Sequence, residues 1–433
     1  MPRAKKLQSS LLFERTRLPS GVRVVTSNLP HTNAVSINFL FGAGSRFETD
    51  SLAGASHLFE HMLFKGTHKR PTPREIVEVV EGVGGTLNAF TERELTGYWC
   101  RLALPHYRQG LDLVADMVSN SILREDDIAR EKPVVYEEIR ASNDSPGGRV
   151  SLLLDQLLWP NQPLGRDIAG SVESVTAITR DEMLGYLHAQ YISKNLVVAV
   201  AGNIAHKDIV DQVHEALGDY RDAKPYEMFP FEDQLQGPAV CVEKRDTEQA
   251  HVAIGIHGLS MFDKDRHALS LLSVILGETM SSRLFEEIRE QRGLAYDIHS
   301  GVGQFKDAGA LFVECGVDPE RTLEAIPVIV EEVAKMRDGV TEREHSQAIE
   351  LTKGRMMLRM EESRAVAGFI GSQELLRNEI RSIEQVVADI EAVTAEDIKR
   401  VAERVIRPEK MAMAIVGPLE DGDPFLKAME FGR

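Results

Sequence analysis

The sequence predicts an α+β protein of two structurally repeated lobes, each an antiparallel-rich sheet with helices packed on one face. Four apolar segments rich in β-branched residues have the composition of strands. They cover residues 34–42, 195–200, 250–258 and 411–416. From Ala34 to Gly202 is 168 positions, and from Ala250 to Gly417 is 167. This nearly equal spacing indicates one α+β unit present twice.

Each half also contains helical stretches and a further strand, at residues 95–104 in the first half and 310–317 in the second. Between the halves, residues 221–238 contain three prolines and are typical of a linker. We therefore expect an N-terminal lobe at residues 1–220, a linker at 221–238 and a homologous C-terminal lobe at 239–433.

Composition excludes several functional classes. The chain has 433 residues, a length that exceeds one hydrophobic core and favours two domains. Of these residues, 43% are hydrophobic and 27% are charged. The net charge of −17 argues against nucleic-acid binding. It would attract basic or unfolded peptides, although a role in solubility alone accounts for it equally well.

The sequence also bears on location. No apolar run reaches 18 residues, so we expect no membrane span. The start of the chain, residues 1–6, is basic, but no apolar signal-peptide region follows it. The three cysteines are widely spaced and odd in number, which favours reduced thiols. The expected location is cytoplasmic.

Residues 57–61 have the spacing H-x-x-E-H, formed by His57, Glu60 and His61. On a helix, positions i, i+3 and i+4 share one face, so two imidazoles and a carboxylate point into the same volume. Two histidines one turn apart can chelate a zinc ion, and the glutamate can act on its bound water as general base.

The simplest alternative is a pair of hydrogen-bonded core histidines. The flanking residues 52–56 and 62–64 are mostly apolar, which predicts a buried helix. Burying two histidines and a glutamate without partners would cost free energy, so they should be paired or bind a metal. The chelating spacing favours one Zn²⁺ per chain.

A catalytic zinc needs a third protein ligand and an open position for water. The segment at residues 131–140 has an apolar stripe and is expected to be helical. Glu131 and Glu138 are two turns apart and share one face, which suits a ligand and a supporting carboxylate. Spacing alone does not choose Glu138 over Glu137, and a solvated acidic face is the alternative.

The motif and its surroundings resemble the pitrilysin, insulysin and mitochondrial processing peptidase family of zinc metallopeptidases. Residues 57–67, Glu131 and Glu138 carry the resemblance, together with segments at residues 18–21, 88–91 and 289–296. In that family a glutamate about 76 positions past the second histidine is the third ligand; Glu138 is 77 past His61. The resemblance implies metal ligands His57, His61 and Glu138, with Glu60 and Glu131 in catalysis. The length fits the short, two-lobed bacterial-type members.

The repeat does not duplicate the metal site. At an offset near 215, the histidine positions fall on Leu272 and Leu276, and Glu138 falls on Lys353. The second lobe is therefore expected to lack metal. The resemblance implies that Arg289 and Tyr296 in this lobe bind substrate, and that Tyr296 also stabilises the oxyanion. A helix-end salt bridge and a core tyrosine are the alternative.

In double-length relatives the matching residues lie across a chamber from the metal. The resemblance therefore implies a homodimer in which Arg289 and Tyr296 act on the partner's zinc, or a heterodimer with a metal-less paralogue.

Residues 84–91 predict a short edge strand to which an extended peptide can add. From the resemblance, Asn88, Ala89 and Phe90 on this strand are expected to contact substrate; Asn88 as a turn former is the alternative.

Taken together, the sequence predicts a zinc metalloendopeptidase that cleaves extended or unfolded peptides inside a chamber, through Glu60-assisted attack of water. Two alternatives remain. One is a non-catalytic subunit of the same fold, although all five motif residues are present here. The other is a chaperone-like peptide-binding chamber with structural zinc, which would normally show four protein ligands.

Overall fold

The computed structural model describes residues 13–431; the basic start of the chain, at residues 1–6, lies outside this range. The chain separates into two compact units, each built around one sheet. The first unit combines the chain up to Tyr136 with residues 168–228 and 356–388. The second combines residues 137–167, residues 229–355 and the chain from Asp389 onward.

The first sheet has six strands in the order β1-β2-β6-β3-β5-β4. In sheet order these are β1 (Phe13–Arg17), β2 (Arg23–Asn28), β6 (Leu196–Gly202), β3 (Ala34–Phe41), β5 (Thr96–Ala103) and β4 (Thr86–Thr91). Only β2 and β6 pair in parallel. The central strands are buried almost throughout, as their apolar composition predicts. Strand β4 forms an edge of the sheet.

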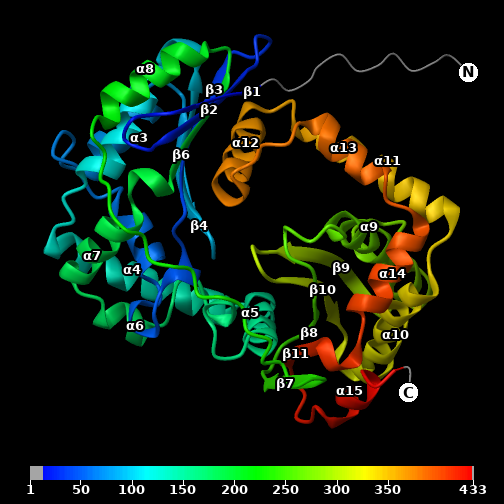
Figure 1. The fold of residues 1–433 in the computed structure, drawn as a ribbon. Helices are drawn as coiled ribbons and strands as arrows, with labels where there is room; N and C mark the ends of the chain where they lie inside the picture. The colour runs from blue at the N-terminus through cyan, green and yellow to red at the C-terminus, as the bar shows by residue number, and fades with distance from the viewer. Residues whose placement is uncertain (1–12, 432–433) are drawn as a thin grey trace, which may run out of the picture. The chain divides into compact units, whose positions relative to one another are not determined.

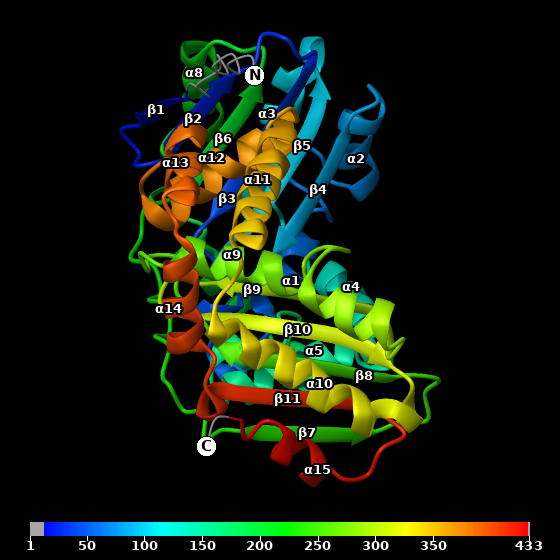
Figure 2. The same cartoon turned by 90° about the vertical axis from the view of Figure 1, so that its right-hand side faces the viewer.

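The second sheet has five strands in the order β7-β11-β8-β10-β9. In sheet order these are β7 (Ala239–Lys244), β11 (Met411–Gly417), β8 (Ala250–His257), β10 (Gly309–Val317) and β9 (Ala295–Gln304), lying side by side in Figure 2. Only β7 and β11 pair in parallel. From β2 onward the first sheet has the same order and the same single parallel pair. The predicted repeat is therefore confirmed.

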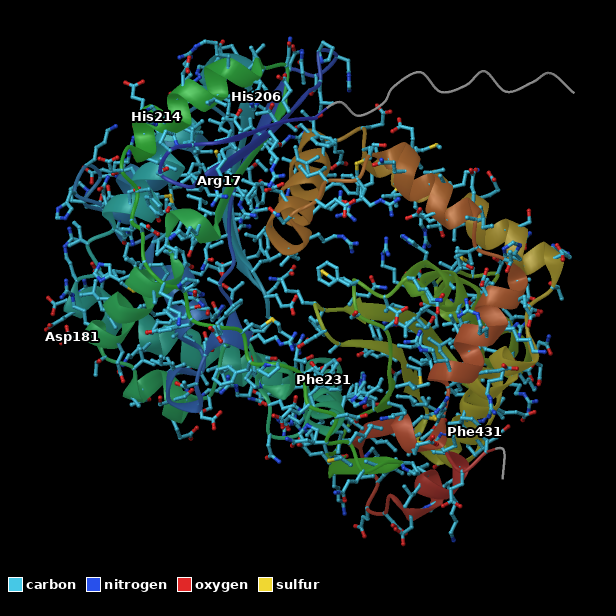
Figure 3. The ribbon with its side chains drawn as sticks, in the orientation of Figure 1. Arg17, Asp181, His206, His214, Phe231 and Phe431 are labelled. Atoms are coloured by element: carbon cyan, nitrogen blue, oxygen red, sulfur yellow. The ribbon has the colours of Figure 1, made fainter. Side chains whose placement is uncertain are left out.

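Helices cover one face of the first sheet. Helix α3 (Tyr107–Asn120) packs on β5 and β3, and α8 (His206–Leu217) packs on β2. His206, labelled in Figure 3, joins the start of α8 to the strands, because its ring nitrogens lie 2.8 Å from the hydroxyls of Thr16 and Thr26. The unit's other helices include α1 (Ala55–Met62), α2 (Pro73–Glu81), α6 (Val172–Ala177) and α7 (Arg180–Gln190). Helix α4 (Glu125–Asp144) begins here and contains the division at residue 136.

In the second unit, α9 (Arg266–Gly277) packs on β9 and against α14 (Ala395–Val405). The further helices that lie wholly in this unit are α10 (Thr322–Lys335) and α15 (Asp423–Ala428). Helix α11 (Glu342–Arg359) begins in this unit and ends in the first, and α13 (Ile383–Glu391) begins in the first unit and ends in this one. A π-helical segment runs over Phe285–Gln291 and contains Arg289. Among residues 13–431, no helix has both the length and the apolar character to cross a bilayer.

Each sheet also carries, on its other face, a helix contributed by the opposite half of the sequence (Figure 1). Helix α12 (Ser363–Arg377) packs on β3 and β6, and α5 (Pro146–Leu158) packs on β11 and β8. Both approaches depend on glycine. A Cβ on Gly371 would lie 2.7 Å from Leu40 Cδ1, and one on Gly255 would lie 2.6 Å from Leu158 Cδ1.

The observed units therefore differ from the expected lobes at residues 1–220 and 239–433. Residues 137–167 belong to the unit of the second sheet, and residues 356–388 belong to the unit of the first. The strand repeat locates the two sheets but does not show which sheet an apolar helix face covers. Residues 221–236 form neither helix nor strand, and the division between the units falls within them, after Met228.

Candidate metal and active site

Helix α1 presents the histidine motif on its one polar face. Leu58, Phe59 and Met62 are fully buried and hold the helix in the core of the first unit. The side chains of His57, Glu60 and His61 are only 19%, 14% and 17% exposed. The two imidazole rings lie with their centroids 4.7 Å apart. The predicted shared face is therefore present, and it is partly open.

Helix α4 brings the third candidate ligand to this face. One ligand atom from each of His57, His61 and Glu138 lies within 4.8 Å of the other two. Glu137 instead pairs with Arg140 at 2.5 Å, and its side chain is 71% exposed. The geometry thus selects Glu138 over Glu137, an alternative that spacing alone leaves open.

The donor set fits zinc. Two imidazole nitrogens and one carboxylate oxygen are the ligand types that Zn²⁺ takes in catalytic sites with three protein ligands. His61 Nδ1 lies 2.9 Å from Glu131 Oε1, which leaves its Nε2 for a metal. A ligating histidine whose other ring nitrogen bonds a carboxylate is the usual arrangement at such sites.

Glu131 is held by His61 on one side and by Lys65 on the other. Its side chain is 8% exposed, and Lys65 forms an ion pair with the oxygen that does not face His61. Burial acts to raise the pKa of Glu131, but the hydrogen bonds and charges of His61 and Lys65 outweigh it and lower the pKa. Glu131 therefore stays ionised and fixes the orientation of the His61 ring.

Glu60 is held in position by a contact from strand β4. The hydroxyl of Thr91, the last residue of β4, donates a hydrogen bond of 2.6 Å to Glu60 Oε2. The same oxygen lies 4.0 Å from His57 Nδ1. The carboxylate is thus held beside the candidate metal ligands, on the helix face that they share.

The beginning of α1 is fixed by a buried carboxylate from the preceding loop. Glu48, which is 1% exposed, accepts hydrogen bonds from the backbone N–H groups of Gly54 and Ser56 at 2.9 and 2.6 Å. The Ser56 and Tyr186 hydroxyls lie 2.6 Å apart, which ties α1 to α7. An anionic cap at a helix N-terminus is stabilising. These bonds set the position from which both histidines project.

The predicted substrate residues lie where an added strand could reach them. Asn88, Ala89 and Phe90 are on β4, the edge strand, and β4 packs beside α1. Asn88 is exposed, and its side-chain oxygen accepts a bond from the Ala89 N–H at 2.8 Å. The segment is a strand, so Asn88 is not a turn former.

Arg289 and Tyr296 lie together in the second unit. The Arg289 guanidinium carbon is 4.7 Å from the centre of the Tyr296 ring and 4.6 Å from that of Phe285. The Tyr296 side chain is 76% exposed, so it is no core tyrosine. An exposed aromatic stacked under a cation is available for contact with another molecule.

Three residues that contact the site, Thr91, Lys65 and Glu48, are not identified by the sequence analysis. Thr91 and Lys65 stand inside the predicted strand and motif segments, but nothing in their spacing shows which carboxylate each one contacts. Glu48 lies nine positions before the motif, and no periodic pattern connects it to α1. Only the fold reveals these contacts.

The fold and the site together define a class: a two-lobed α+β protein with the inverted H-x-x-E-H motif of zinc peptidases and a third candidate ligand beside it. Family comparisons agree. The family described as Insulinase (Peptidase family M16) matches residues 23–172, and that described as Peptidase M16 inactive domain matches residues 177–352. The chain belongs to peptidase family M16.

Relatives and solved structures match over nearly the full length. An uncharacterized zinc protease of Streptomyces coelicolor is 36% identical over 94% of this chain and 90% of its own. One of Mycobacterium leprae is 37% identical over 96% and 94%. A crystal structure titled as a protease from Helicobacter pylori has a TM-score of 0.88 at 24% identity, covering 95% of this chain and all of that one, which supports the fold.

Proposed function

We propose that this protein is a zinc-dependent endopeptidase that cleaves extended or unfolded peptides. The observation that carries the proposal is the cluster of His57, His61 and Glu138, three ligand types suited to zinc within 4.8 Å of one another. Relatives of similar length are named zinc proteases, which supports the same assignment.

In the proposed reaction, Glu60 is the general base. Zinc, when bound, supplies Lewis acidity that brings the pKa of a coordinated water to about 7. The Glu60 carboxylate, oriented by Thr91, takes a proton from the water that attacks the peptide carbonyl and passes it to the leaving amine. Glu131 keeps the His61 ring in the orientation that exposes Nε2.

Strand β4 is the proposed substrate platform. As an edge strand it has one ladder neighbour, β5, and its other side offers backbone N–H and C=O groups. An extended peptide can pair with these groups as an additional strand, beside the carboxylate of Glu60. Asn88, Ala89 and Phe90 are the proposed contacts.

The test compares the zinc-loaded wild type with Glu60→Gln on quenched fluorescent peptides that have no fixed structure. We expect the wild type to cleave them, a chelator to stop cleavage and zinc to restore it. Glu60→Gln should keep zinc and lose activity by about 10²- to 10⁴-fold, the usual general-base contribution. Glu137→Gln, a change at an exposed neighbour, is the control. Wild-type turnover in Glu60→Gln would remove this residue from the mechanism.

The second candidate is a non-catalytic or chaperone-like peptide-binding subunit. One observation favours it: the family that matches residues 177–352 is described as an inactive domain. That match covers the second half of the chain, whereas the complete ligand set lies in the first. Binding without cleavage by the zinc-loaded wild type would support this alternative.

The proposal extends to assembly. We propose that two copies form a homodimer inside which substrate is enclosed, with Arg289 and Tyr296 of one copy acting at the zinc of the other. The exposed Tyr296 ring beside Arg289 supports a contact of this kind. Mixing His61→Ala chains with Tyr296→Phe chains should restore activity to part of the sites; no recovery would contradict action in trans.

A further inference from the structure

A cavity of about 740 Å³ lies between strand β4 and helix α12, entirely within the first unit. We call it the β4–α12 pocket. Its apolar lining includes Phe90 on β4, Leu95 and Trp99 beside it, and Phe369 and Leu376 on α12. No role in the proposed chemistry requires this cavity, because the metal ligands and Glu60 lie on α1 and α4.

The two faces of β4 have different neighbours: one faces Glu60 and the other faces the pocket. Thr91 faces Glu60, and because side chains alternate along a strand, Asn88 and Phe90 face the opposite way. Their partners on β5 are Trp99 and Gly97, and the row continues toward α12. The pocket is therefore on the face of β4 that the metal side does not use.

This alternation fixes what a bound peptide would present to the pocket. A peptide that adds to the edge of β4 follows the same pleat, so its side chains point alternately to the metal side and to the pocket side. Side chains two positions apart along such a peptide are roughly 6.4–6.8 Å apart. A cavity of 740 Å³ has room for two of them.

The lining determines which side chains fit. Leu40, Leu95 and Trp99 are 2%, 5% and 6% exposed and form a nonpolar interior. Arg364 lies over the Trp99 ring at 3.8 Å, and Arg364 and Glu362 are both exposed residues of the lining. An aromatic ring that enters the pocket can contact the apolar side chains and stack against the guanidinium of Arg364.

We propose that the β4–α12 pocket selects peptides with large apolar side chains, aromatic ones foremost, at alternate positions of the segment lying on β4. The inference rests on the proposed function in placing the peptide on β4. It adds a specificity determinant that comes from α12, a helix of the other half of the sequence.

Gly368 offers a way to fill the pocket. It lines the cavity from α12, and a Cβ built on it meets only Asn38 Nδ2, at 3.9 Å. Gly368→Phe should occupy the space, and Gly368→Ala should leave it open. Ser372→Leu, one turn further along the same lining, is an independent filling variant. Gly185→Phe is the matched control, because Gly185 is an exposed glycine within α7, away from the pocket.

The experiment measures peptide binding by fluorescence anisotropy to the zinc-loaded full chain carrying Glu60→Gln, so that no probe is consumed. The probes are fluorescein-labelled alanine- and serine-rich peptides with two phenylalanines at positions i and i+2, two at i and i+1, or none. We expect the i, i+2 peptide to bind at least about 10-fold more tightly than the peptide without phenylalanine. We also expect it to bind more tightly than the i, i+1 peptide.

Both filling variants should remove this preference, while Gly368→Ala and Gly185→Phe should keep it; circular dichroism identifies a variant that fails to fold. Equal affinity for the two spacings, an unchanged preference in both folded filling variants, or no binding of any peptide would overturn the proposal. Cleavage by chains with Glu60 intact separates the two hypotheses. Selective binding without cleavage contradicts the proposed function alone, whereas equally fast cleavage of all three peptides contradicts the pocket alone.

Discussion

The two halves of the chain provide sheets of the same strand order from β2 onward, yet among residues 13–431 only the first half contains a set of candidate metal ligands. His57 and His61 of α1 correspond to Leu272 and Leu276, which are fully buried in α9. Glu138 of α4 corresponds to Lys353 of α11, which pairs with Glu391 at 2.6 Å and Glu350 at 2.9 Å. The shared fold therefore does not by itself supply metal ligands; the candidate ligands are three side chains on two helices of the first half.

The two exchanged helices, α12 and α5, also differ in the side chains that lie between each helix and its sheet. On the first sheet, α12 leaves a cavity beside β4, partly lined by apolar side chains. On the second, Ser151 of the equivalent helix α5 donates a 2.7 Å hydrogen bond to Glu314, and His299 lies 3.5 Å from the same carboxylate. The hydrogen bond to Glu314 raises the pKa of His299 despite its partial burial. The corresponding region of the second unit is thus occupied by paired polar groups.

The largest expected effect comes from making α1 resemble α9. His61→Leu removes one of three ligands, so zinc affinity should fall by more than the ~10- to 100-fold typical of losing a supporting partner. Peptidase activity should fall to background. The fold should persist, because leucine occupies the equivalent position in α9. Zinc titration and thermal melting check both expectations; full zinc binding by this variant would contradict the assigned ligand set.

A smaller effect is expected from the carboxylate behind His61. Glu131→Gln keeps the shape of the side chain but weakens its bonds to His61 and Lys65, so zinc affinity should fall by about 10- to 100-fold. Competition with a chromogenic chelator measures this change. Glu137→Gln on the same helix should leave the affinity unaltered, and equal losses in both variants would point to a general effect of charge.

The smallest effect is expected in the second half. Lys353→Met keeps the apolar stem of the side chain and removes two ion pairs that hold it against Glu350 and Glu391. The free energy of unfolding should change by no more than about 1 kcal/mol, and zinc binding should not change. Urea denaturation and zinc titration provide the measurements. A loss of zinc in this variant would mean that the second half contributes to the site.

Much of the fold could be predicted because β-strands leave a strong local pattern. The strands expected at residues 34–42 and 250–258 are present as β3 and β8, and those expected at 195–200 and 411–416 are present as β6 and β11. The exchange of α5 and α12 could not be predicted. An apolar helix face shows that a helix is buried, but not which of two similar sheets buries it.

The same limit applies to the candidate site: the sequence indicates the candidate ligands but not the contacts that position them. Helical spacing gathers His57, Glu60 and His61, and family resemblance adds Glu138, because these residues stand at fixed positions in the sequence. The contacts of Thr91 with Glu60 and of Lys65 with Glu131 join residues far apart in the sequence through tertiary packing, and the contact of Glu48 with the start of α1 depends on the path of the intervening loop. No repeat period contains that information.

The most direct test of the proposed zinc site is the zinc content of the purified chain in the wild type and in Glu138→Gln. It is measured by mass spectrometry after zinc loading and dialysis. We expect one zinc per wild-type chain and a large loss in the variant, with Glu137→Gln retaining one. A full zinc in Glu138→Gln at unchanged affinity, or none in the loaded wild type, would contradict the proposed site.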